Sequence, residues 1–367
     1  NGDQFQQLDE RTIYGGDWNR KWQSSYNASH LHHSIGVQLR YDDIDQVGLI
    51  STRDREPVDI TRLDRVRETA LGAYYEMQWD HSLHWRWVLG IRADHYWFDV
   101  RSDTPENSGS ASEGIVSPKA SLIYRIDDGS EIYASGGFGF HSNDARGTTI
   151  SIDPKTGEPA EPVDPLVRSR GGELGFRTFS SNGWIGSIAA WILKLDSELL
   201  FVGDAGITEP SRPSRRWGIE FNNTWMLSDT WRVEADVAWT DARFTDDAPE
   251  GHRIPGALET VITGAISAEW PNGWFGSLRL RYFSGAPLIE DGSVKSDGSS
   301  MVNLLLGWSD EHWRLKLEAL NLLDSDDHDI DYFYASRLPG EPGEGIEDIH
   351  FHIFEPRQVR LQASWLF

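Results

Sequence analysis

The sequence has no cysteine, only 3 methionines among its 367 residues and no long apolar run. Because a membrane-spanning helix needs about 20 mostly apolar residues, a helical membrane protein is excluded. The absence of cysteine suits a protein that avoids stray disulfides in an oxidising compartment, although many cytosolic chains share it. Basic residues are also few: 34 Lys and Arg against 58 Asp and Glu give a formal charge of −24, which argues against nucleic acid as a partner.

Signals for catalysis and for secretion are missing too. The chain has no Gly-x-Ser-x-Gly nucleophile elbow, no His-Glu-x-x-His pair and no P-loop, so we predict neither enzyme activity nor a cofactor. It opens on Asn1-Gly2-Asp3, whereas a secretory signal would show a charged and then an apolar segment. We therefore expect a mature product or a piece of a longer chain.

The sequence does contain strict alternation and many aromatic residues, with 17 Trp and 11 Tyr. Residues 359–367 close the chain with apolar side chains at every second position, which places them on one face of a strand. These apolar residues are Val359, Leu361, Ala363, Trp365 and Phe367. Outer-membrane barrels end on such a strand, and Trp365 and Phe367 are our candidates for the barrel-assembly signal.

The same alternation recurs along the chain. It is clearest in residues 71–79, 85–94, 231–240, 274–282 and 313–319. Each apolar set begins or ends on Trp or Tyr, as expected for aromatic girdles at the two membrane interfaces. The segments have the length of tilted membrane-spanning strands, whereas the strands of a soluble sandwich usually have ~5–6 residues. We therefore favour a transmembrane β-barrel over a soluble antiparallel sandwich.

Turn residues divide the sequence into hairpins in which short turns alternate with long polar loops. The short turns are 80–82, 127–129, 181–183, 228–229, 271–273 and 309–311. Short periplasmic turns and longer extracellular loops are typical of outer-membrane barrels. The expected strands are 11–23, 33–53, 68–80, 84–100, 114–126, 130–142, 171–181, 183–201, 215–228, 230–245, 257–270, 273–284, 298–308, 312–323 and 351–367. Bacterial single-chain barrels have an even number of strands, so we expect the chain to be incomplete at its N-terminus.

Five short segments carry motifs whose combined resemblance to known proteins covers essentially the whole chain. They are Val116–Tyr124 with its Pro118-Lys119 pair, Ile132–Phe140, Gly172-Glu173-Leu174-Gly175, Trp217-Gly218-Ile219-Glu220 and Leu320-Asn321-Leu322-Leu323-Asp324. In this order, and with the terminal Phe367, they resemble the strands of the TonB-dependent outer-membrane receptors. The chain departs from that family's pattern after Phe140, where His141 and Ser142 replace the commoner Arg and Pro.

The resemblance implies an all-β, antiparallel, up-and-down transmembrane barrel of about 22 strands, of which about 15 would be present here. It also implies an N-terminal plug domain with a TonB-contact box, and no segment of this sequence matches either one. We therefore expect residues 1–367 to form the barrel domain, with the plug and the first strands missing.

The function that the resemblance implies is energised import of a scarce ligand across the outer membrane of a Gram-negative bacterium. The ligand would be a siderophore-like metal chelate or another nutrient. The implied partners are outer-membrane lipid and lipopolysaccharide, the TonB complex through the missing plug, the barrel-assembly machinery through the C-terminal strand, and the small-molecule ligand. A passive porin-like channel and an adhesin or structural barrel are the alternatives.

The loop 324–350 is the first candidate site. It carries nine acidic residues against Arg337 alone, with imidazole and phenol side chains in it or beside it. Oxygen and imidazole donors can bind a cation or a metal chelate; an acidic solvated loop beside lipopolysaccharide is the alternative. The candidates for ligand contact are His328, Asp329, Asp331, Tyr332 and Tyr334.

The loop 141–170 is the second candidate, because long loops often carry function. Its opening residues His141, Asn143, Asp144 and Arg146 would contact ligand or else cap the strand and tie the loop down.

A basic ladder near the C-terminus is the third candidate. The alternation places its side chains on lumen-facing strand positions, where charge is tolerated. The ladder consists of Arg279, Arg281, Arg314, Lys316, Arg357 and Arg360. These residues would pair with acidic groups of the plug or line a path for an anionic substrate.

Overall fold

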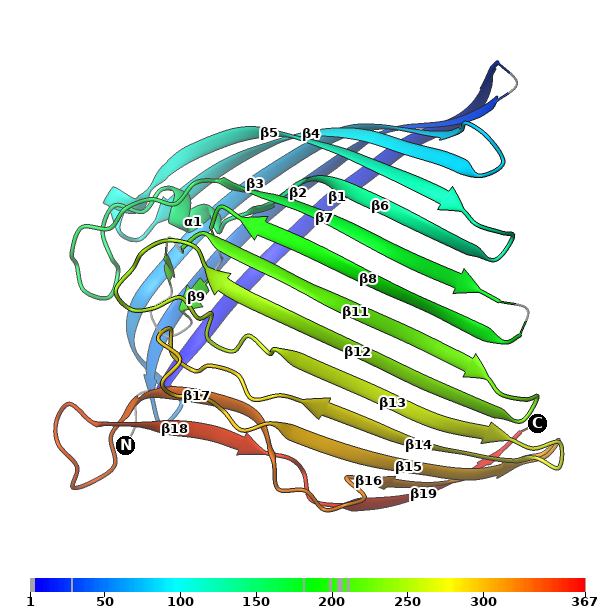
Figure 1. Ribbon diagram of the computed structural model, residues 1–367. Coiled ribbons are helices and arrows are strands. Elements are labelled where there is room, and N and C mark those ends of the chain that lie inside the picture. Colours follow the sequence, from blue (N-terminus) through cyan, green and yellow to red (C-terminus); the bar gives the residue numbers. More distant parts are fainter. Residues whose placement is uncertain are drawn as a thin grey trace. The chain divides into compact units, whose positions relative to one another are not determined.

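The computed structural model describes residues 4–27, 29–180, 182–197, 200–202, 207–209 and 212–366. Fifteen strands of this part form one antiparallel sheet, in which each strand pairs with its neighbours in chain order (Figure 1). Two short hairpins lie outside this sheet. Among the described residues, none of the helices has the length and apolar character that crossing a membrane would require.

The bounds of the elements locate each side chain discussed below. The fifteen sheet strands are β1 (Gln4–Tyr26), β2 (Ser29–Arg53), β3 (Glu56–Asp80), β4 (Trp85–Ser102), β5 (Gly109–Arg125), β6 (Ser130–Ser142), β7 (Leu166–Phe179), β8 (Trp184–Leu195), β11 (Ser214–Met226), β12 (Trp231–Phe244), β13 (Thr260–Glu269), β14 (Trp274–Phe283), β15 (Ser299–Ser309), β16 (Trp313–Leu320) and β19 (Gln358–Trp365). The separate hairpins are β9 (Leu200–Val202) with β10 (Ile207–Glu209), and β17 (His328–Ser336) with β18 (Ile346–Ile353). The helical turns are η1 (Pro105–Asn107) and α1 (Ala145–Thr148).

The predicted fold class and the predicted fifteen strands of the sheet are confirmed, and the bounds of β6 coincide with those expected. One prediction was wrong at the C-terminus, where 351–367 was expected to be a single strand. Residues 346–353 pair with β17 instead, and β19 begins only at Gln358. Pro356 lies in the break, where its missing N–H cannot support a sheet ladder. Phe367 lies outside the described residues.

A second difference concerns residues 54–67, which we expected to form a long polar loop. β2 and β3 instead continue as a 25-residue pair that closes at Asp54 and Arg55. Both turn residues have positive φ, 53° and 71°, the backbone geometry that matches the twist of a tight hairpin. The polar residues misled the prediction because Arg62 and Asp64 are buried as an ion pair rather than solvated.

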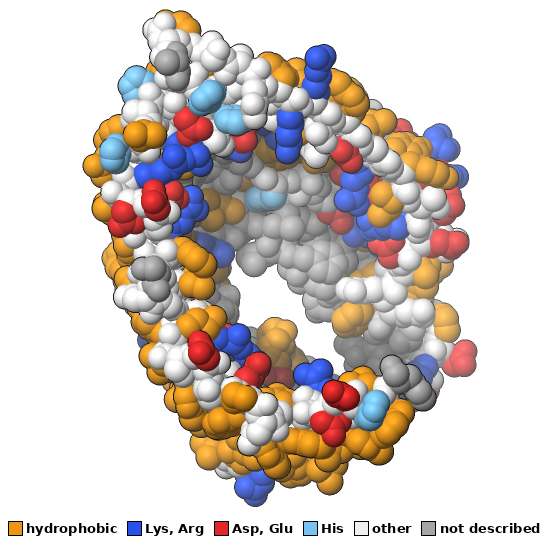
Figure 2. Space-filling model, turned by 90° about the vertical axis from the view of Figure 1, so that its right-hand side faces the viewer, with side chains coloured by type: hydrophobic (Ala, Val, Ile, Leu, Met, Phe, Trp, Pro, Cys, Tyr) orange, Lys and Arg blue, Asp and Glu red, His pale blue; other side chains and the backbone are white. Residues whose placement is uncertain are grey.

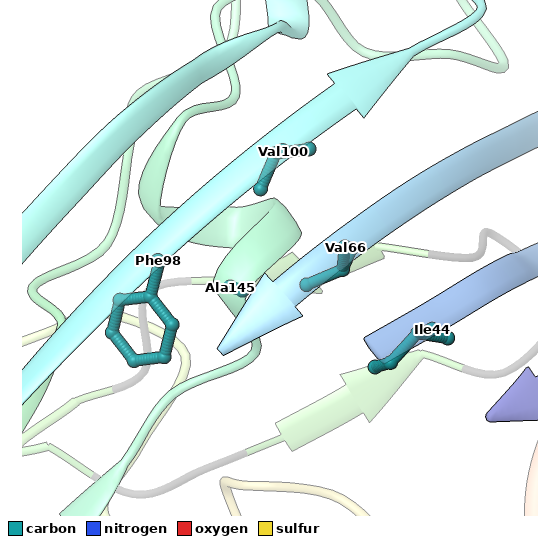
Figure 3. Close-up of a cluster of buried hydrophobic side chains, with 5 residues drawn as sticks. All are labelled: Ile44, Val66, Phe98, Val100 and Ala145. Atoms are coloured by element: carbon teal, nitrogen blue, oxygen red, sulfur yellow. The ribbon is translucent and has the colours of Figure 1, made fainter. Parts of the chain in front are cut away.

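The chain forms two compact units. Unit 1 comprises residues 1–124, 134–172 and 193–214, and unit 2 comprises residues 125–133, 173–192 and 215–367. In unit 1 the loop after β6 folds back so that α1 packs on β3 and β4. A buried apolar cluster joins them (Figure 3): Ile44, Val66, Phe98, Val100 and Ala145. The removal of these side chains from water holds the loop against the strands.

In unit 2 the strands carry one apolar and one polar face. Residues directly opposite each other in antiparallel strands share a face, and the register pairs Trp274 with Trp308 and Trp313 with Trp365. The Trp313 and Trp365 rings meet edge to face, 4.7 Å apart. Figure 2 shows hydrophobic side chains gathered along the lower margin of the view, where the C-terminal strands lie, with charged side chains above them.

Candidate ligand-binding surfaces

Five members of the basic ladder share the polar face of β14, β16 and β19. Arg279 lies opposite Asn303, and Lys316 lies opposite Gly307 and Gln362. Their strand neighbours Leu278 and Leu315 point to the apolar face, where both are exposed. The five residues on the polar face are Arg279, Arg281, Arg314, Lys316 and Arg360. Strand alternation thus gathers the cationic groups of distant segments on one surface.

Aromatic rings rather than carboxylates hold much of this ladder. The Arg281 guanidinium carbon lies 4.9 Å from the centroid of the Phe283 ring, and that of Arg314 lies 5.4 Å from the Phe275 ring. Cation–π contact orients a guanidinium without neutralising it. Arg279 comes within 3.8 Å of Glu234. In the described part of the chain, Lys316 has neither an ion-pair nor a hydrogen-bond partner. The ladder therefore presents positive charge at the surface.

Arg357 does not belong to this face, contrary to our expectation. It lies in the loop before β19, because the strand begins one residue later. Its backbone N–H donates to Asp324 Oδ1 (2.9 Å), and its guanidinium donates to the carbonyl oxygen of Leu322 (3.2 Å) and to Asp324 Oδ2 (3.3 Å). Arg357 thus closes the base of the loop that β16 and β19 flank.

The hairpin β17–β18 is held at the end of the ladder that lies away from the short turns. Phe354 follows β18, is buried, and stacks its ring 5.4 Å from the Arg281 guanidinium. Its backbone N–H donates to the carbonyl oxygen of Asp327 (3.0 Å). Arg281 therefore lies between the other residues of the ladder and the base of the β17–β18 hairpin.

Asn321 organises the base of the same hairpin. It is 2% exposed and has φ of +47°, a backbone region in which asparagine is among the best-tolerated residues. Its amide nitrogen donates to the carbonyl oxygens of Ser325 (2.8 Å) and Glu355 (3.1 Å), and its amide oxygen accepts from the Ser325 N–H (2.9 Å). One side chain thereby ties together both ends of the hairpin loop.

Imidazole and phenol groups cover one face of this hairpin. The register places Tyr332 opposite His350 and Ile330 opposite His352, so these four side chains share a face with Tyr334. Tyr332 and Tyr334 are 55% and 53% exposed. The Tyr334 ring stacks on His350 at 3.9 Å, and His352 Nδ1 lies 2.9 Å from an oxygen of Asp329. The face combines flat rings with hydrogen-bonding edges.

The other predicted contacts of this loop lie on the opposite face. His328 Nδ1 is 2.6 Å from Asp331 Oδ1, and its ring stacks on Phe351 at 3.8 Å. Within the described ranges, no group of three or more His, Cys, Asp or Glu side chains could hold a metal ion.

The residues predicted in loop 141–170 fasten that loop. Asn143 is buried and donates from Nδ2 to the carbonyl oxygen of Asp164 (2.7 Å). Asp144 caps α1 by accepting from the Arg146 N–H (2.9 Å) and also binds the Arg146 guanidinium (2.7 Å). Burial opposes the ionisation of Asp144, but the hydrogen bonds and charge of Arg146 outweigh it and lower the pKa of Asp144. His141 ends up on β6.

Asn107, which the sequence analysis missed, anchors the far part of the same loop. It is fully buried. Its Nδ2 donates to the carbonyl oxygen of Ile152 (2.8 Å), and its Oδ1 accepts from the N–H groups of Ser151 and Ile152, both at 2.9 Å. No local sequence signal joins residues more than 40 positions apart. The local signal in the sequence is Pro105, because proline is favoured at the first position of a helical turn.

Comparisons with known proteins bear on the whole chain. Residues 1–322 match the family described as TonB dependent receptor-like, beta-barrel. The ferrioxamine B receptor of Salmonella typhimurium (strain LT2) is 24% identical in an alignment that covers 66% of this chain and 34% of that protein. The chain therefore spans about a third of the length of this curated relative.

Solved structures agree in fold. The ferric yersiniabactin uptake receptor FyuA from Yersinia pestis superposes with a TM-score of 0.77 at 14% identity, over 99% of this chain and 55% of that one. The ferric citrate transporter FecA in the unliganded form gives 0.77 at 15% identity, over 99% and 55%. The ferric-catecholate import receptor Fiu from K12 E. coli gives 0.75 at 13% identity, over 98% and 55%. At such identities the likeness establishes the fold alone.

Proposed function

The chain belongs to the family of TonB-dependent receptor β-barrels, and from this premise we propose that it serves in the import of a siderophore-like metal chelate across the outer membrane. The family is one of transport receptors. The relatives named above are receptors or transporters of ferrioxamine B, ferric yersiniabactin and ferric citrate. Energy would come from TonB, acting through a plug domain, and the barrel-assembly machinery would recognise the C-terminal strand.

The observation that carries this proposal is the position of Arg281. It lies at the upper end of a cationic strand face and stacks under Phe354, the root of a hairpin that exposes Tyr332 and Tyr334. A metal chelate of carboxylate, catecholate or hydroxamate groups offers anionic oxygens, and a catecholate also offers flat rings. Guanidinium groups bind such oxygens through charge-assisted hydrogen bonds, and tyrosine faces stack on rings. The proposed ligand is therefore an anionic chelate that first contacts the tyrosines of the hairpin and then binds the cationic groups of the ladder.

The proposal is tested by uptake into cells that lack other iron receptors and carry the complete gene for this protein. Radiolabelled ferric hydroxamate, catecholate and carboxylate chelates are supplied in turn, with and without functional TonB. We expect accumulation of one class, and its loss when TonB is absent. Equal accumulation without TonB would identify a passive channel and overturn the receptor proposal. Growth on small sugars supplied at low concentration serves as a control for general permeability.

A further inference from the structure

The apolar face of unit 1 ends in an aromatic row. The register aligns Tyr14 with Tyr41, Tyr41 with Thr69, and Thr69 with Trp97. The Tyr14 and Tyr41 rings stack with centroids 6.3 Å apart, and Trp97 is exposed. Exposed apolar side chains such as Leu71 continue this face on the side of the short turns. In a membrane barrel such an aromatic row marks the boundary between hydrocarbon and headgroups.

The next positions on the same face are charged. Strand alternation brings Arg67 to the row beyond Thr69, opposite Asp43 on β2 and Asp99 on β4. One row further, Arg65 lies opposite Arg101. Val66 and Asp64 point to the other face, where both are buried. Three guanidiniums therefore stand together, one and two rows past the aromatic boundary.

Their carboxylate partners leave these guanidiniums accessible. Arg65 approaches Asp45 closely (2.7 Å), but Arg67 is 3.5 Å from Asp43. Arg101 is 4.0 Å from Asp99, and its side chain is 70% exposed. Exposed ion pairs of this kind contribute little to stability, so a stronger ligand can replace them.

A similar order of residues occurs in unit 2. Trp217 and Trp239 meet edge to face with ring centroids 4.9 Å apart. Two positions beyond Trp239 on β12 is Asp241, which pairs with Arg243 (2.8 Å). Asp241 is also 3.9 Å from Arg253. An aromatic boundary followed by arginine thus occurs independently in each unit.

We propose that Arg65, Arg67 and Arg101 bind the phosphate groups of a phosphorylated lipid in the outer leaflet. The planar guanidinium matches two phosphate oxygens at once, which an ammonium cannot do, and all three cations here are arginine. The intervening carboxylates suit the divalent cations that bridge carboxylate and phosphate groups. The proposal rests on the membrane location inferred above, and it assigns a lipid site separate from the chelate surface of unit 2.

The position of the patch favours lipid over free phosphate. In the membrane location inferred above, the guanidiniums would lie at the depth where headgroups begin, next to a face whose exposed Leu71 and Trp97 would meet acyl chains. They lie on the strand ends away from the short turn that joins β3 to β4 near Asp80. Phosphate and apolar chain would therefore be bound side by side, which inorganic phosphate cannot reproduce.

The test measures binding of bisphosphorylated lipid A to the full chain in detergent micelles, by native mass spectrometry. We expect that Arg65→Gln, Arg67→Gln and Arg101→Gln together weaken binding by about tenfold or more, because three charge-assisted contacts are lost. Dephosphorylated lipid A should bind the unsubstituted chain about as weakly as bisphosphorylated lipid A binds this variant. A matched variant removes three guanidiniums from the polar face of unit 2: Arg125→Gln, Arg177→Gln and Arg232→Gln. It should bind lipid A as the unsubstituted chain does.

Three outcomes would overturn the proposal: equal binding by the triple variant, equal loss in the matched variant, or full competition by inorganic phosphate. Heat-modifiable migration on a gel checks that each variant is folded. If the triple variant does not fold, Arg101→Gln alone removes the most exposed of the three and should weaken binding about threefold. The measurement uses neither a chelate nor TonB, so a failure of the receptor proposal would leave its result unaffected.

Discussion

Replacement of Asn107 by alanine tests whether one buried side chain fixes the loop after β6. The substitution removes three hydrogen bonds of 2.8–2.9 Å to residues 151 and 152. Each such bond contributes about 1 kcal/mol net, and buried groups left without partners add to the cost. We therefore expect the loop to lose about 3 kcal/mol of local stability, equivalent to an increase of about 150-fold in its opening equilibrium.

The assay is amide hydrogen exchange of Ser151 and Ile152, whose N–H groups donate directly to Asn107 Oδ1. Their exchange should accelerate by about two orders of magnitude, while amides of β13 and β14 should exchange as before. Asn107→Asp serves as a comparison, because it keeps an acceptor oxygen but sets a buried carboxylate oxygen against the Ile152 carbonyl oxygen. Exchange should therefore be accelerated in this variant too, and less so at a pH low enough to protonate the carboxyl group. Unchanged exchange of both amides in Asn107→Ala would refute the reasoning.

Three further predictions concern the remaining contacts. The pKa of Asp144 is lowered in the folded loop from its ordinary value of 3.8. The stabilising effect of the ionised Asp144 is therefore complete above that value and is lost as the pH falls through the lowered pKa. Amide exchange in α1 should accelerate in that pH range, and Asp144→Asn should abolish the pH dependence. Asn321→Ala removes three hydrogen bonds at the hairpin root and should cost about 2–3 kcal/mol of local stability, seen as faster exchange of the Ser325 amide; exchange at the rate of the unsubstituted chain would count against this role. Arg281→Gln should weaken binding of an anionic chelate by about tenfold, measured by quenching of tryptophan fluorescence; Arg232→Gln, whose guanidinium pairs with Glu234 at 3.2 Å, should have little effect, and equal losses in both variants would contradict a specific role for Arg281.

The sheet could be predicted because its signals are local. Alternation and turn residues occur within ten positions of each other, and β6 was placed at its observed bounds from them. The polar face of β14 and β16 followed from the same alternation. The break before β19 was missed because residues 349–353 also alternate, and the sequence does not say with which strand they pair.

The fastening of the loops could not be predicted, since it depends on long-range pairing. The burial of Arg62 and Asp64 requires α1 to lie over them, and the Arg62 guanidinium reaches the carbonyl oxygen of Arg146, 84 residues away, at 3.4 Å. A run of several polar residues resembles a solvated loop as long as the element that packs over it, here α1, is unknown. For the same reason, the contact of Arg281 with Phe354 becomes apparent only in the structure.

The length of the β2–β3 hairpin has a consequence for access from outside the cell. Twenty-five residues at about 3.3 Å each span about 80 Å, whereas about 9–11 residues cross the hydrocarbon layer. In the outer-membrane location proposed above, more than half of the hairpin would therefore stand clear of the acyl chains, held by strand pairing that runs, with three register shifts, up to the two-residue turn at Asp54 and Arg55. A peptide epitope inserted between these two residues would lie at the outer end of the β2–β3 hairpin, where an antibody could bind it on intact cells.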